Sequence, residues 1–181
     1  MKKSWMAGVL FIMALFLLGV SISSSLAEEA GSYSTIVVKE FSLEGAAIQE
    51  NQDTQAFAQT LPLDFAQMVK GYLESMKVSQ NVLVEKPGME GVSREKAVVV
   101  EGRFTKITAG STAARIVVGF GAGASTVGAE WTVKEAGTGK ILGKSNRNQH
   151  TGGGHRGITA LEADSRYLAK YVASNIAKLL K

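Results

Sequence analysis

The chain has 181 residues, with 20 Lys or Arg, 16 Asp or Glu, a formal net charge of +4 and no cysteine. A chain of this length can bury one substantial core, and that core must be stable through packing alone because no disulfide can form. No cluster of basic residues interleaved with aromatic residues is present, which argues against a nucleic-acid-binding surface.

Residues 1–27 have the features of an export signal. Two lysines precede an apolar run over residues 5–20, and the small residues Ser25 and Ala27 precede the polar Glu28. Signal peptidase recognises this arrangement, so we expect cleavage between Ala27 and Glu28 and a periplasmic or secreted product. The alternative, a retained membrane anchor, is less favoured because a span needs about 20 apolar residues. Without a cysteine at the cleavage site, we expect no stable lipid anchor on the mature chain.

The first part of the mature chain predicts a strand and a helix. Thr35–Leu43 is rich in β-branched and aromatic residues, which favours a buried strand with Phe41 on the side of Val37 and opposite Ile36. Weak periodicity over residues 44–60 predicts a loop with at most a short helical turn. Pro62 is expected in the first turn of the helix that follows. The apolar stripe of that helix comprises Phe65, Met68, Val69, Tyr72, Leu73 and Met76.

The middle of the chain predicts further strands. Asn81–Glu85 is a short strand and a turn follows it. Ala97–Ile107 is a strand in which Val98, Val100 and Phe104 face inward, Glu101 and Arg103 face outward, and Gly102 marks a bulge. Residues 115–118 form another β-branched run that enters a glycine-rich segment.

The last third predicts a hairpin and a helix. Residues 125–134 alternate cleanly, and residues 136–139 turn this strand into a second one over residues 140–149. Thr159 and Glu162 fit a capping box at the start of the final helix. The stripe of that helix comprises Leu161, Leu168, Val172, Ile176 and Leu179.

The order of these elements indicates an α+β fold. We expect a two-layer sandwich in which two helices pack on one face of a mixed sheet of about five to six strands. Residues 28–34 are a flexible lead-in, and residues 35–181 form a single domain. The first helix joins two strands that we expect to be parallel. The other face of the sheet is open to water or to a partner.

Two glycine motifs bear on phosphate binding. Gly119, Gly121 and Ala124 match the spacing of the dinucleotide fingerprint, but a strand and not a helix is predicted after them, so we expect no bound nucleotide. Gly143-Lys144-Ser145 resembles the end of a P-loop, but Thr138 stands where that motif needs glycine. The sequence therefore predicts no cofactor site.

The remaining candidates for chemistry are two histidines and exposed carboxylates. His150 and His155 flank a glycine loop beside Arg156, and they are too few to hold a metal without further ligands. Glu101, Glu130 and Glu135 are expected on exposed strand faces, where carboxylates are usually solvated. We therefore predict no catalytic residue, no metal site and no enzyme activity. A small-ligand binder or hydrolase using the loop from His150 to Arg156 is an alternative.

Three segments carry a resemblance to a known family. They are Gly102 with Phe104, the run from Arg115 to Ala124 (RIVVGFGAGA), and the turn over residues 137–139 with Lys140. In these segments the chain resembles the bacterial envelope family called domain of unknown function 4410, and the similarity would extend over about residues 35–181. Many members are lipoproteins, from which this chain departs by lacking the cysteine. In element order it is also similar to modules of penicillin-binding-protein activator lipoproteins, the curli secretion pore and the Tol-Pal translocation protein.

These observations predict a non-enzymatic envelope module that binds a protein partner or itself. The expected contact surface is the glycine segment with the adjacent strand edges, where backbone groups could pair with a partner strand. Its residues are Arg115, Gly119, Phe120, Gly121 and Gly123. The alternative is a subunit of an oligomeric envelope pore or secretion assembly, suggested by the apolar run over residues 116–129.

Overall fold

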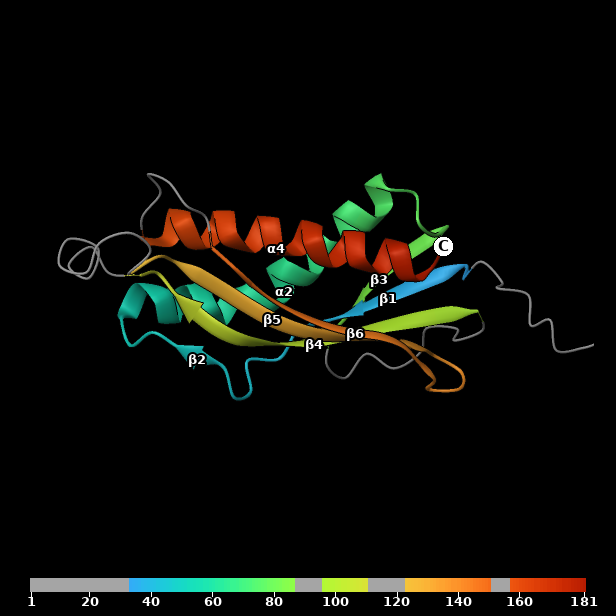
Figure 1. Cartoon of the computed structure of the whole chain (residues 1–181), viewed down its shortest axis with the longest axis horizontal. Helices are drawn as coiled ribbons and strands as arrows, with labels where there is room; N and C mark the ends of the chain where they lie inside the picture. Colours follow the sequence, from blue (N-terminus) through green and yellow to red (C-terminus); the bar gives the residue numbers. More distant parts are fainter. Residues whose placement is uncertain (1–32, 87–95, 111–122, 151–156) are drawn as a thin grey trace, which may run out of the picture. The chain divides into compact units, whose positions relative to one another are not determined.

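The computed structural model describes residues 33–86, 96–110, 123–150 and 157–181, which belong to one compact unit, Ser32–Lys181 (Figure 1). The elements in chain order are β1 (Thr35–Lys39), β2 (Ala47–Ile48), α2 (Gln52–Ser75), β3 (Asn81–Glu85), β4 (Ala97–Thr108), β5 (Thr126–Glu135), β6 (Ile141–Gln149) and α4 (Gly157–Leu179). The expected signal segment and the expected strand over residues 115–118 lie outside the described residues.

The six strands form one mixed sheet in the order β3-β1-β4-β5-β6, with β2 beside the far end of β4. β1 is parallel to both of its neighbours, β3 and β4, whereas β5 is antiparallel to β4 and to β6. The chain passes through α2 between β1 and β3, so the expected parallel arrangement of the two strands joined by the first helix is confirmed.

Both described helices, α2 and α4, pack on the same face of the sheet. α4 contacts β5 and β6, and α2 contacts β1, β3 and the neighbouring α4. Three phenylalanines lie at the centre of the core: the ring of Phe65 is 4.9 Å from that of Phe41 and 5.2 Å from that of Phe104, both edge-on. The predicted α+β two-layer sandwich is thus confirmed. Among the described helices, none has the length and apolar character needed to cross a membrane.

The prediction for the start of α2 was wrong. The helix begins at Gln52, ten residues before Pro62, which lies inside the helix. Asn51 caps it, because the Asn51 side-chain oxygen accepts a hydrogen bond of 2.8 Å from the backbone N–H of Thr54. The buried residues of this first half include Thr54 and Ala58, which are too small or too polar to give a clear apolar stripe. Tertiary packing therefore keeps the chain helical through Pro62, although proline has no backbone N–H to donate to the helix.

Two details of the first half of the sheet also differ from expectation. β1 ends at Lys39, so the alternation of the strand no longer applies at Phe41, which packs on the helix side of the sheet with Ile36. Gly102 does not mark a bulge; the irregularity of β4 lies between Phe104 and Lys106. Instead, the Phe41 ring occupies the space of a side chain at Gly102, where a Cβ atom would lie 2.3 Å from Phe41 Cε1.

The second half of the sheet follows the prediction closely. β5 follows Gly123 as a strand, and its residues Val127, Ala129, Trp131 and Val133 are buried. α4 begins at Gly157, so Thr159 lies in its first turn and the predicted cap at Thr159 was wrong. The stripe of α4 is buried apart from Leu179.

Candidate functional site

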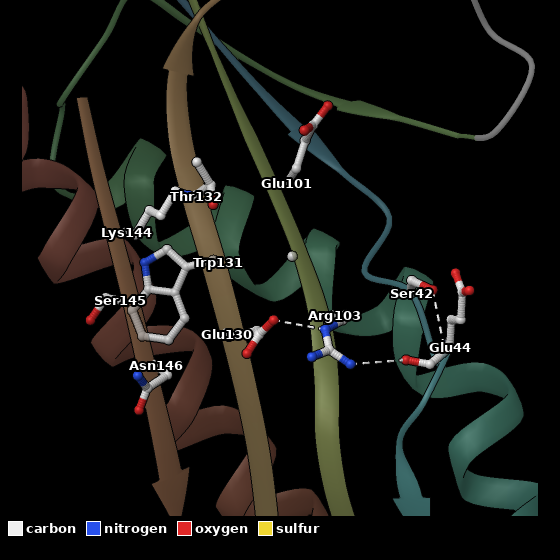
Figure 2. A pocket seen from close by; sticks show the side chains of 11 residues that line it. Ser42, Glu44, Glu101, Arg103, Glu130, Trp131, Thr132, Lys144, Ser145 and Asn146 are labelled. Carbon is white, nitrogen blue, oxygen red and sulfur yellow. Dashed lines mark hydrogen bonds and ion pairs between the residues drawn. The ribbon is translucent and has the colours of Figure 1, made fainter. Parts of the chain in front are cut away.

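The face of the sheet opposite the helices is polar over β4, β5 and β6. It contains a shallow hollow of about 550 Å³, the open-face groove, which Figure 2 shows from close by. Strand alternation explains its character, because residues between the buried positions of β4 and β5 point away from the helices. The charged residues that line the groove are Glu44, Glu101, Arg103, Glu130 and Lys144.

Glu101 is held by one lysine on each carboxylate oxygen. Lys39 Nζ lies 2.8 Å from Glu101 Oε1, and Lys134 Nζ lies 2.6 Å from Oε2. Partial burial acts to raise the pKa of Glu101, but the hydrogen bonds and charges of the two lysines together outweigh it. The pKa of Glu101 is therefore lower than its ordinary value, and the carboxylate is ionised at neutral pH.

A second ion pair lies further along the same strands. Arg103 Nε donates to Glu130 Oε1 at 2.7 Å, and Arg103 Nη1 donates to the backbone carbonyl of Glu44 at 3.4 Å. Both charged side chains are about half exposed, so the pair contributes at most about 1 kcal/mol to stability. Its main effect is to fix the direction of a guanidinium group and a carboxylate on an open surface.

These arrangements suit recognition better than proton transfer. A general acid at neutral pH needs a raised pKa, whereas the pKa of Glu101 is lowered. Within the described ranges, no group of three potential metal ligands comes together. Lys144 is exposed and forms no ion pair with any other described residue, so it can offer its charge to a partner.

A second surface lies on the helix side of the sheet, where α4 packs over β6. The Arg147 guanidinium carbon lies 4.0 Å from the ring centre of Tyr171, and that ring meets Trp131 edge-on at 6.1 Å. Trp131 Nε1 in turn donates to Asn175 Oδ1 at 3.0 Å. Tyr167, one turn before Tyr171, is 59% exposed. Tyrosine and arginine are enriched in protein interfaces, which makes this side a second candidate contact surface.

The structure describes only part of the surface predicted from sequence. Arg115, Gly119, Phe120 and Gly121 lie outside the described residues, as do Ala27 and Glu28 at the expected cleavage site. Gly123 is described. It has a positive φ of 73° and lies three residues before β5 begins at Thr126. The glycine surface therefore stays a prediction.

The histidine loop is also described only in part. His150 lies directly after β6, whereas His155 and Arg156 are outside the described residues. Nothing in the described part of the loop adds support for a ligand site there.

Sequence reasoning found some of the charged groups on the open face and missed how others come together. The outward direction of Glu101, Arg103 and Glu130 was predicted from alternation and is confirmed. The convergence of Lys39 and Lys134 on Glu101 was missed, because it depends on the register between strands. Alternation around the buried positions of each strand was the available signal for these lysines.

Comparison with known families identifies the chain. The family model described as "Domain of unknown function (DUF4410)" matches residues 36–153, well over half of the sequence. The chain belongs to the DUF4410 family. The matched range includes the six strands apart from the first residue of β1, and thus both the open-face groove and the edges of the sheet. No curated protein matches this DUF4410 chain.

Solved structures share the fold of this DUF4410 protein. A PelC variant dodecamer from Paraburkholderia phytofirmans is 14% identical with a TM-score of 0.53, and the match covers 83% of this chain and 91% of that one. The PelC dodecamer in another crystal form is 13% identical with a TM-score of 0.51, covering 80% and 89%. The hypothetical protein CT253 from Chlamydia trachomatis is 10% identical with a TM-score of 0.50, covering 81% and 98%. At these identities the similarity establishes the fold alone.

Proposed function

We propose that this DUF4410 protein is an exported, non-enzymatic module of the cell envelope that binds proteins in the periplasm, including further copies of itself. The observation that carries the proposal is the charged, open face of the sheet. Its carboxylates Glu101 and Glu130 are paired with cations, and Lys144 extends from it without a described partner. Such a surface offers directed charges to a partner.

Self-association is the form of binding that the comparisons favour. Two of the similar solved structures are PelC dodecamers, so this fold is compatible with assembly of many copies. The pore alternative has less support from the described residues. The described end of its apolar run belongs to β5, where Val127 and Ala129 are buried in the core and unavailable to lipid.

The test begins with localisation and mass. We would express the full sequence in a bacterium, fractionate the cells, and measure the mass of the purified chain by analytical ultracentrifugation. We expect a processed chain in the periplasmic or secreted fraction that is larger than one copy or bound to an envelope protein. Full-length protein in the cytosol, or a monomer that binds no envelope protein at any concentration, would contradict the proposal.

A variant of the groove connects the binding to the surface. Arg103→Glu removes the ion pair with Glu130 and reverses one charge on the open face. Lys178→Glu makes the same change of charge in the last turn of α4 and is the matched control. We expect Arg103→Glu to weaken binding of an envelope partner to the open face and Lys178→Glu to leave that binding unchanged, with circular dichroism confirming that both variants fold.

A further inference from the structure

Both edges of the sheet are open in the described part of the chain. β3 pairs only with β1, and β6 pairs only with β5. The exposed large apolar side chains of the described residues lie on these edge strands or on the helices that contact them. Ile141, Tyr167, Tyr171 and Leu179 lie on β6 and α4, whereas Leu83 and Met76 lie on β3 and at the end of α2. An unpaired strand beside exposed apolar groups is a surface on which another strand can add.

On the open face, the two edges are joined by a row of paired residues, which we call the apolar row. Leu83 pairs with Val37, and Val37 pairs with Val99. Val99 then pairs with Lys134, and Lys134 pairs with Ile141. The row thus ends in an exposed apolar side chain at each edge: Leu83 is 38% exposed and Ile141 is 51% exposed.

The next row on the same face, the charged row, has opposite charges at its two ends. Glu85 pairs with Lys39, which forms the ion pair with Glu101. Glu101 pairs with Thr132, and Thr132 pairs with Lys144. Glu85 at one edge and Lys144 at the other form no ion pair with other described residues. Residues directly opposite on adjacent strands come within about 5 Å at Cβ, where opposite charges attract.

The two edge strands, β3 and β6, run in the same direction and differ in charge. β6 is antiparallel to β5, β5 is antiparallel to β4, and β4 and β3 are both parallel to β1, so β6 and β3 run the same way. β6 has two basic residues and no acidic one, whereas β3 has one acidic residue and no basic one. A two-fold contact of β6 with itself would bring like charges together, but a contact of β6 with β3 brings opposite charges together.

We propose that β6 of one copy adds to β3 of a second copy of this chain, head to tail and parallel. In this arrangement Ile141 lies opposite Leu83 of the next copy, and Lys144 lies opposite Glu85 of the next copy. The three-residue step from Ile141 to Lys144 matches the two-residue step of β3 because β6 has one extra residue, Leu142, at its register irregularity. The proposal rests on the self-association in the proposed function and names the surface that produces it. Because each copy uses two different edges, the contact can repeat until a ring closes or a filament grows.

Cysteine crosslinking tests which edges meet, because the chain contains no cysteine of its own. We would express the full sequence with Ile141→Cys or with Leu83→Cys, mix the two purified proteins and oxidise them. We expect a disulfide-linked dimer in the mixture and none with either variant alone. A crosslink within the Ile141→Cys protein alone would reveal a two-fold contact and overturn the head-to-tail arrangement.

A charge exchange tests the charged row. Lys144→Glu and Glu85→Lys each replace an attraction by a repulsion and should raise the dissociation constant roughly 2- to 30-fold. The double variant restores the opposite pair and should return the dissociation constant close to that of the unaltered protein. Equal weakening in the double variant would overturn the proposed pairing, provided that all three variants keep the circular dichroism of the unaltered protein.

Failure of this inference differs from failure of the proposed function. If the protein assembles by mass but the mixture gives no crosslink, the copies meet elsewhere, and the function stands without these edges. A monomer that binds another envelope protein would likewise overturn the inference alone. A monomer without any partner would overturn both.

Discussion

Gly102 is a position where a single added methyl group would enter the packed aromatic core. A Cβ atom there would lie 2.3 Å from one carbon of the Phe41 ring and 2.6 Å from two others. The ring cannot simply move away, because Phe41 is buried and packs edge-on against Phe65 at 4.9 Å and close to Phe104 at 5.8 Å. Gly102→Ala must therefore displace either the aromatic cluster or the backbone of β4.

Overpacking of a tight core typically costs about 1–3 kcal/mol. For a domain of about 150 residues this lowers the melting temperature by roughly 2–12 °C. The free energy of unfolding would be measured by urea denaturation followed by circular dichroism. Gly137→Ala is the matched control, because no atom lies within 4 Å of a Cβ at that turn position. We expect the control to change the free energy by less than about 0.5 kcal/mol.

A double-mutant cycle identifies the cause of the loss. Phe41→Leu removes the ring that meets the new methyl group, so the cost of Gly102→Ala should be smaller in the Phe41→Leu background than in the unaltered protein. Equal costs in both backgrounds would show that the ring is not the obstacle. A Gly102→Ala protein as stable as the Gly137→Ala control would refute the reasoning altogether.

Three further predictions concern single hydrogen bonds or charges. Asn51→Ala removes the cap that accepts from Thr54 and should cost about 1 kcal/mol in urea denaturation, whereas Asn51→Asp, which keeps the acceptor, should cost little. Glu101 has a folded-state pKa below its unfolded value, so its stabilisation is present above the unfolded pKa and is lost as pH falls through the folded pKa. When the pH is lowered from 6 to about 3, the urea midpoint of the Glu101→Gln variant should therefore fall by less than that of the unaltered protein. An equal fall in the two proteins would contradict this prediction. Asn175→Ala leaves the buried Trp131 N–H without its acceptor and should cost about 1–3 kcal/mol, measured by urea denaturation followed by tryptophan fluorescence; an unchanged midpoint would show that water replaces the amide.

Local patterns predicted the elements with strong periodicity. The alternation in residues 125–134 and the stripe from Leu161 to Ile176 predicted which side chains are buried, and the structure confirms them. The first half of α2 was missed because its buried residues include Thr54 and Ala58, and because Pro62 suggested a helix start. In that segment the N-cap and the packing against the sheet override the weak local signal.

The sequence by itself therefore determined the fold class, the order of most elements and the outward direction of residues such as Glu101 and Arg103. These properties follow from periods of two and 3.6 residues within single segments. Only the tertiary structure decided that Lys39 and Lys134 meet at Glu101, and that Ile141 and Leu83 end the same row. Register between strands distant in sequence is set by packing of the whole core, and no single segment contains that information.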